Sequence, residues 1–203
     1  MPGKLLIIVL LVLVAITAYV YWPRPTGPAA LPPPKTMEEI ASLPDDQLVS
    51  AVVFDLSHRM FRDGFDAKAW RSLPDAARHV WVSAAVEPKL AGHGFTFFLM
   101  TYDPGSPELK DVRDAYAALS AAGLSRVMEE AVSVEEREGG KAAQACIEYF
   151  RSQGATPFLR PPGFVDPFAT TDAAFKAELA CSGIDRLRLA FVKQHLDAIM
   201  AAK

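Results

Sequence analysis

The sequence predicts an all-α fold: a compact multi-helix domain behind a single N-terminal transmembrane helix. After residue 36, apolar residues recur at intervals of three and four in nearly every segment, which is the helical period. Helix start and stop signals separate these segments, and no neighbouring stretches alternate as paired strands would. An uncharged apolar run over residues 5–22 predicts the N-terminal span.

The apolar run over residues 5–22 is long enough to cross the hydrocarbon layer, since a helix of this length spans roughly 27 Å. Tyr21 and Trp22 lie at its C-terminal end, as an interfacial aromatic belt would. A cleaved signal peptide is the alternative, but only Lys4 precedes the run, which is longer than such peptides usually carry. We therefore predict a signal-anchor over residues 1–23 that contacts the lipid bilayer.

A proline-rich linker over residues 24–36 follows the anchor and leads to the domain over residues 37–203. Five of the twelve residues in 24–35 are proline, which favours an extended, semi-rigid spacer. Basic residues flank the anchor on both sides, Lys4 before it and Arg24 after it. We expect the N-terminus in the cytoplasm and the domain outside it, in the periplasm if the protein is bacterial.

The charge of the domain is mildly acidic. The chain has 21 basic and 24 acidic residues, and residues 1–24 contain two of the basic residues and none of the acids, so the remainder carries a net charge of −5. Direct binding of nucleic acid requires clustered positive charge, which this balance does not favour. We expect an unidentified protein as the partner, and no direct nucleic-acid binding.

Capping residues, first-turn prolines and glycines delimit the predicted helices of the domain. Ser42 with Asp45 resembles a capping box, whereas Gly123 and the pair Gly139-Gly140 are typical stops. The two helices that meet at Gly123 are predicted to form an antiparallel hairpin. A proline-rich loop is expected over residues 154–169. The predicted helices cover residues 45–61, 72–86, 95–102, 106–123, 125–138, 141–153, 170–181 and 183–200.

The aromatic stretch over residues 80–102 is predicted to form the centre of the core, because large aromatic side chains bury the most area. Pro88 removes one backbone donor and is expected to end or kink the preceding helix near Val86. Gly92-His93-Gly94 then breaks the chain, and a short buried helix is expected to begin at Phe95. The stretch therefore predicts a corner between two packed segments.

Glu87, then Gly92-His93-Gly94-Phe95, then Phe97-Phe98 resemble the E…NGGF.QFF signature of the DNA-mimic-protein-like family, a family catalogued as a domain of unknown function. The segment AYAALSAAGLSRVMEEAV looks like the family's two helices around a glycine corner, and the resemblance extends over about residues 45–199. It implies a compact all-α domain, and its best understood members are acidic proteins that imitate DNA. Gly92 replaces the signature's Asn and His93 replaces one of its two glycines, and the net charge of this domain is modest.

His93 and Glu87 are the candidate catalytic residues. An exposed imidazole on a break in the chain is suited to act as a general base or a metal ligand, with Glu87 as its partner. No pair of histidines has the spacing of a zinc-binding motif, and no cofactor motif is present. The alternative is that the Gly-His-Gly break is only a structural corner.

The densest acidic run is a candidate partner-binding surface, and its alternative is an ordinary solvated helix face. Two cysteines, Cys146 and Cys181, are either a disulfide or two independent thiols. These patterns favour a membrane-anchored, non-enzymatic protein-binding domain. The alternatives are an envelope hydrolase or metal-dependent enzyme that uses His93 and Glu87, and a DNA-mimic inhibitor of a DNA-binding protein. The acidic candidates are Glu129, Glu130, Glu135, Glu136 and Glu138.

Overall fold

The computed structural model confirms the all-α prediction, because every regular element in the residues it describes is helical. These residues belong to one compact unit, Pro34–Lys203. The predicted anchor and nearly all of the predicted linker lie outside them. In the described part of the chain, no helix is both long and apolar enough to cross a bilayer. The structure describes residues 36–61, 64–101, 105–153 and 160–201.

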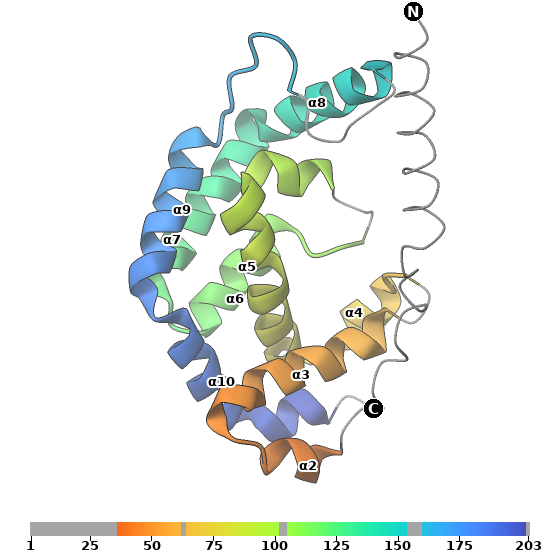
Figure 1. The fold of residues 1–203 in the computed structure, drawn as a ribbon, viewed down its shortest axis with the longest axis vertical. Coiled ribbons are helices and arrows are strands. Elements are labelled where there is room, and N and C mark those ends of the chain that lie inside the picture. Colours follow the sequence, from red (N-terminus) through yellow and green to blue (C-terminus); the bar gives the residue numbers. More distant parts are fainter. Residues whose placement is uncertain (1–35, 62–63, 102–104, 154–159, 202–203) are drawn as a thin grey trace, which may run out of the picture. The chain divides into compact units, whose positions relative to one another are not determined.

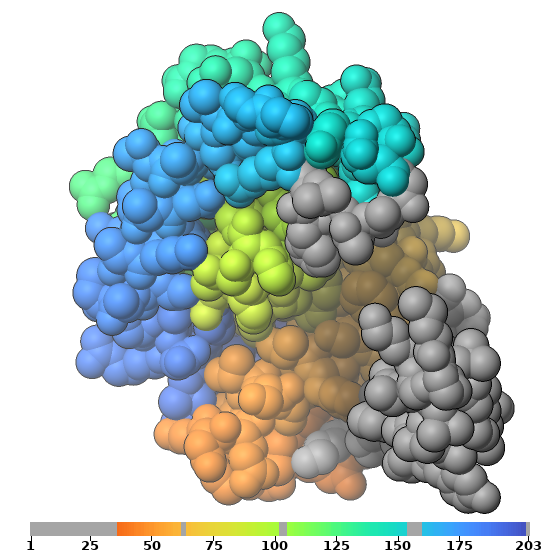
Figure 2. All heavy atoms as spheres, turned by 45° about the horizontal axis from the view of Figure 1, so that its top comes forward, coloured from red at the N-terminus to blue at the C-terminus, as the bar shows by residue number. Residues whose placement is uncertain are grey.

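One long helix, α5, lies in the middle of the domain, with the other helices arranged around it (Figure 1). Helices α3, α6, α8, α9 and α10 each pack against α5. Part of α5, in yellow-green, reaches the surface between the C-terminal helices and α3 (Figure 2). The helices are α2 (Met37–Ala41), α3 (Asp45–Met60), α4 (Ala67–Ser72), α5 (Asp75–Met100), α6 (Leu109–Ala118), α7 (Ala122–Val134), the π-helical turn η1 (Glu135–Gly139), α8 (Gly140–Gln153), α9 (Ala169–Ser182) and α10 (Ile184–Met200).

The capping box of the domain lies one helix earlier than the sequence pattern predicts. Thr36 accepts a hydrogen bond from the Glu39 backbone N–H at 3.2 Å, and the Glu39 carboxylate accepts one from the Thr36 N–H at 2.6 Å. This reciprocal pair begins α2, whereas Ser42 donates its hydroxyl to the Glu39 carbonyl. The prediction of a box at Ser42 and Asp45 is therefore wrong. Helix α3 instead begins after Pro44 without a side-chain cap.

Pro88 does not end its helix, which corrects the prediction of a stop near Val86. Helix α5 continues through Pro88, and the residue inside it with a non-helical backbone is Gly94. Pro88 is exposed, and Ala84, whose carbonyl loses its intrahelical donor, is half-buried. The break therefore falls within the predicted Gly-His-Gly segment, and a helical segment follows it as predicted.

Helices α6 and α7 form a closely packed pair with a short connection, but the turn between them is made by Ser120 and not by Gly123. Ser120 has a φ of 60°, and its N–H donates to the Ala117 carbonyl at 3.0 Å. The Ala121 N–H donates to the Tyr116 carbonyl at 2.9 Å, which completes a Schellman motif. Gly123 lies inside the first turn of α7, so its prediction as a stop is wrong.

Gly139 and Gly140 do not interrupt the chain, although the sequence predicts a separation there. The turn η1 joins α7 to α8 directly, with π-type hydrogen bonding over Glu135–Gly139. A Cβ atom on Gly139 would lie 2.5 Å from the Phe168 ring, so a glycine is needed for close packing. Gly139 therefore marks a contact with the segment before α9.

The buried aromatic residues of α5 belong to one hydrophobic core, in which their ring contacts form two groups. Phe95 is fully buried, and its ring centroid lies 5.5 Å from that of Phe168 and 5.7 Å from that of Phe175. Trp81 belongs to a second group, with ring centroids 5.5 Å from Trp70 and 5.9 Å from Phe61. Helix α5 thus carries one aromatic anchor for each group.

His79 gives the stability of the domain a specific dependence on pH. Burial lowers the pKa of His79 below its ordinary 6.5, although Asp75 acts in the opposite direction. The unfolded chain therefore binds a proton at a pH where the folded protein does not, so the stability that the neutral imidazole contributes is lost as the pH falls below about 6.5. We expect wild type to lose stability more steeply than His79→Gln between about pH 7 and pH 5.5 in urea melts. Equal slopes would contradict this assignment.

Candidate functional site

The corner at Gly94 is held by an aspartate from α9. Gly94 has φ 83° and ψ 175°, a conformation that is essentially restricted to glycine. The N–H of Phe95 donates to Asp172 Oδ1 at 2.9 Å. Asp172 therefore caps the last segment of α5 from a distance of 77 residues in sequence. Burial raises the pKa of this half-buried carboxyl, and the hydrogen bond from Phe95 offsets part of that effect.

A second aspartate from the same region binds the residue that follows this cap. The buried Thr96 hydroxyl donates to Asp166 Oδ1 at 2.7 Å, and the backbone N–H of Phe168 donates to the same oxygen at 3.0 Å. Arg160 pairs with the other oxygen of Asp166 at 2.9 Å. Asp166 and Asp172 thus attach the start of α9 to the corner of α5. Helix α9 begins at Ala169, one residue before the start that the sequence predicts.

A buried arginine forms a further polar contact of α5. Arg188 of α10 is only 4% exposed and forms an ion pair with Glu87. Its guanidinium also donates to the Ser83 carbonyl at 2.9 Å and to Asp185 at 3.0 Å. The Tyr116 hydroxyl is buried beside this group, and burial, then the Glu87 carboxylate, raise the pKa of Tyr116 above its usual range. The contacts cross-link α5 and α10.

The two candidate catalytic residues do not come together at one site. Glu87 is directed to Arg188, whereas His93 is exposed and its ring centroid lies 4.6 Å from that of Phe97. Glu87 and His93 lie six positions apart on one helix, a spacing that does not place side chains on the same face. Among the described residues, no group of three or more His, Cys, Asp or Glu side chains could hold a metal ion.

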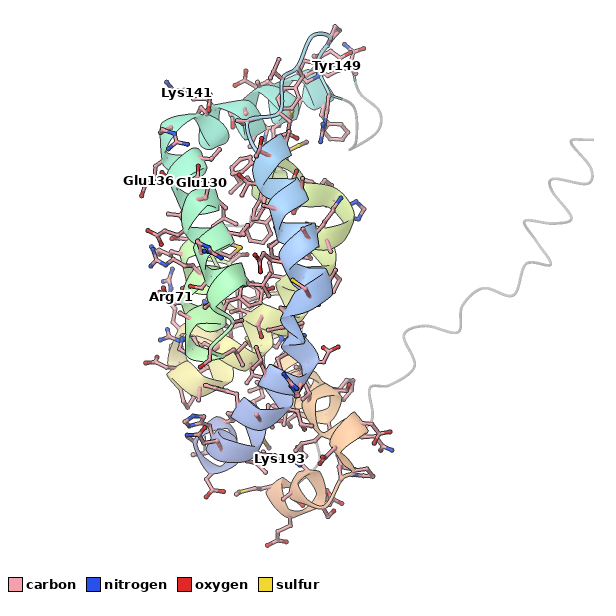
Figure 3. The ribbon with its side chains drawn as sticks, turned by 90° about the vertical axis from the view of Figure 1, so that its left-hand side faces the viewer. Arg71, Glu130, Glu136, Lys141, Tyr149 and Lys193 are labelled. Carbon is pink, nitrogen blue, oxygen red and sulfur yellow. The ribbon has the colours of Figure 1, made fainter. Side chains whose placement is uncertain are left out.

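The acidic residues of α7 and η1 are exposed at one end of the domain, apart from half-buried Glu135. Glu129 pairs with Arg113 at 3.0 Å, and Glu130 pairs with Arg137 at 3.3 Å. Figure 3 shows Glu130 and Glu136 close to one another on the outer surface of these elements. We define the acidic face by its exposed carboxylates, namely Glu129, Glu130, Glu136 and Glu138.

Glu135 differs from the other members of the acidic run because it lines a cavity of about 270 Å³. Burial raises the pKa of Glu135, and the neighbouring carboxylates Glu108 and Glu136 add to the effect. The sequence gives no sign of this difference, because Glu135 and Glu136 are adjacent and identical in type. The π-helical turn separates their environments.

The two cysteines are free thiols in this structure. Cys146 is buried in α8, and the charges of Arg160 and Asp166, just before α9, act on its thiol. Cys181 is exposed in the last turn of α9. Of the two alternatives, the structure has the independent thiols.

Sequence reasoning missed three residues that hold the domain together: Asp166, Asp172 and Arg188. Arg188 had a signal, because it lies four residues after Ile184 and four before Val192, on the apolar face of its helix. The two aspartates had none, since an acid near the start of a helix is ordinarily a local feature. No family model, curated protein or solved structure matches this chain.

Proposed function

We propose that this protein is a membrane-tethered, non-enzymatic protein-binding domain whose acidic face receives a basic partner. The apolar run over residues 5–22 supports the tether, and the linker after it supports a domain that stands away from the bilayer on its outer side. The resemblance to the DNA-mimic-protein-like family supports a binding role over catalysis.

The observation that carries the proposal is the concentration of exposed carboxylates on α7 and η1. Glu136 and Glu138 are exposed within one π-helical turn, and Glu130 lies one to two turns before them. The ion pair of Glu130 with Arg137 joins two side chains that are each about 60% exposed. Exposed pairs of this kind contribute about 0–1 kcal/mol, so a partner's lysine or arginine can replace them at little cost.

The same ion pairs distinguish this proposal from DNA mimicry. A DNA mimic needs an extended array of negative charges at the spacing of phosphates, and here Glu129 and Glu130 are each neutralised by an arginine of the same domain. The envelope-hydrolase alternative loses support because Glu87 is committed to Arg188. We therefore favour a limited acidic surface that recognises a basic protein segment.

Charge reversal at the acidic face tests this function. The full-length chain carries a photo-crosslinking residue at Ser133 in membranes, and its cross-linked protein is identified by mass spectrometry. We expect the double variant Glu136→Lys/Glu138→Lys to lose the cross-link, because it reverses the charge that attracts the partner. We also expect wild type to lose the cross-link at high salt, because salt screens exposed charges. The control is Asp46→Lys/Asp197→Lys, which reverses two exposed acids on α3 and α10. A cross-link that survives the first variant would refute the proposal.

A further inference from the structure

The cavity beside Glu135 has apolar walls and one acidic side. It lies among α5, α6, η1 and α8, and has a volume of about 270 Å³. Glu108 and Glu135 supply its carboxylates, and the exposed Gln144 and Gly140 lie at its edge. The apolar walls come from Phe98, Leu99, Leu109, Ala143 and Ile147.

These walls and charges match a side chain with an aliphatic stem and a positive head. The stem of a lysine side chain packs on apolar surface while its ammonium group donates to oxygen acceptors. Glu108 is already paired with Lys110 at 2.5 Å, and the Lys110 side chain is 60% exposed on the outside of that pair. Glu135 is held at the first position of η1, where its carbonyl accepts the Gly140 N–H. Glu135 is half-buried and lines the cavity, so its carboxylate can accept hydrogen bonds from a ligand ammonium group there.

We propose that this cavity binds the side chain of a lysine from the protein partner, with the aliphatic stem against Leu109 and Ile147 and the ammonium group on Glu135. The inference rests on the proposed function, because it names the anchoring residue of the same basic partner. The acidic face attracts the partner over a distance, and the cavity fixes one lysine in place. Burial and the neighbouring carboxylates raise the pKa of Glu135, and a bound ammonium group would reverse that shift.

The experiment uses the full-length, isotope-labelled chain in detergent micelles, with the backbone amide signals of Gly140 and Ala143 as reporters. The probe is the tripeptide acetyl-Gly-Lys-Gly-amide. Two matched tripeptides carry norleucine, which keeps the stem, or acetyl-lysine, which keeps the length, and neither is charged. We expect saturable shifts with the lysine peptide, and affinities for the other two that are weaker by about tenfold or more.

Three variants distinguish binding of the lysine peptide in the cavity from binding elsewhere on the surface. Glu135→Gln should weaken binding of the lysine peptide by about tenfold. Asp46→Asn makes the same charge change at an exposed acid on α3 that does not line the cavity, and it should leave the affinity within about twofold. Gly140→Leu should abolish binding with the fold intact. Gly140 has helical angles, and a Cβ there meets only the Glu135 carbonyl at 3.9 Å, an ordinary contact.

The outcomes of this experiment are separate from those of the cross-linking test. Equal binding of the norleucine peptide, or an unchanged affinity in Glu135→Gln, would overturn the lysine site while the acidic face could still lose its partner on charge reversal. Tighter binding of free cadaverine than of the lysine peptide would also overturn it, because the cavity would then select a free diamine. Selective lysine binding that Glu135→Gln and Gly140→Leu remove would support the inference even if the cross-link is unaffected.

Discussion

Replacement of Gly94 with alanine should lower the free energy of unfolding by about 3–5 kcal/mol. Two costs combine in this variant. The backbone at φ 83° and ψ 175° lies in a region that costs about 1–3 kcal/mol for a residue with a side chain. The new Cβ would also lie 2.5 Å from Asp172 Oδ2, so the carboxylate must move and its hydrogen bond to Phe95 is lost, at about 1–3 kcal/mol.

Gly92→Ala is the matched control for this variant. Gly92 is exposed, lies in the same helix, and has no atom within 4 Å of the position that a Cβ would occupy. This substitution should raise stability by about 0.4–1 kcal/mol, because alanine is the better helix former. Urea melts followed by circular dichroism measure both effects. The double variant Gly94→Ala/Asp172→Ala should relieve the steric clash but keep the backbone strain. A Gly94→Ala loss below about 1 kcal/mol would show that the corner is not strained.

Arg188→Met should lower the free energy of unfolding by about 3–5 kcal/mol, the usual effect of removing one partner of a buried ion pair. Methionine retains most of the aliphatic stem, so packing changes little. The Glu87 carboxylate loses its partner, and the Ser83 carbonyl loses a hydrogen bond of 2.9 Å. The decrease in the free energy of unfolding therefore measures the cost of leaving these polar groups without a partner. Denaturant melts at neutral pH measure this decrease.

The double variant Glu87→Gln/Arg188→Met separates pairing from packing. Glutamine removes the buried charge, so the double variant should recover about 1–3 kcal/mol of the loss in Arg188→Met. Glu87→Gln also serves the functional question, since it removes the carboxylate that the enzyme hypothesis requires. A double variant that is no more stable than Arg188→Met would show that Glu87 carries no uncompensated charge in the single variant.

The sequence predicted the longer helices, along which apolar residues recur at the helical period, but it did not predict the short helices α2 and α4. It predicted their connections less well, because these depend on contacts from elsewhere in the chain. Pro88 looks like a stop, yet the helix continues through it. Gly123 looks like a cap, yet a Schellman motif at Ser120 turns the chain first. Several residues in one segment can each favour the end of a helix, and tertiary packing determines where the helix ends.

For the candidate site too, local patterns could be predicted from the sequence, whereas contacts between distant residues could not. The sequence identified the acidic run as a candidate surface. It did not distinguish Glu135, because the cavity beside this residue is formed by α5, α6 and α8 together. Glu87 and His93 are close in sequence, and the helical geometry between them directs one to α10 and leaves the other exposed. Contacts between residues that are distant in sequence, such as the hydrogen bond from the Phe95 N–H to Asp172, leave no local pattern in the sequence.

The cap on α5 from Asp172 has a consequence for the order in which the chain folds. The acceptor for Phe95 lies 77 residues later, so the corner stays incomplete until most of the domain has been synthesised. Helix α10 adds a longer delay, since it packs on α2 and α3 at the start of the domain. Such non-local closure slows folding and exposes apolar surface while the chain is unfinished. We therefore expect a nascent domain that lacks α9 and α10 to bind chaperones through its exposed apolar surface. A chain truncated before Asp172 should aggregate for the same reason.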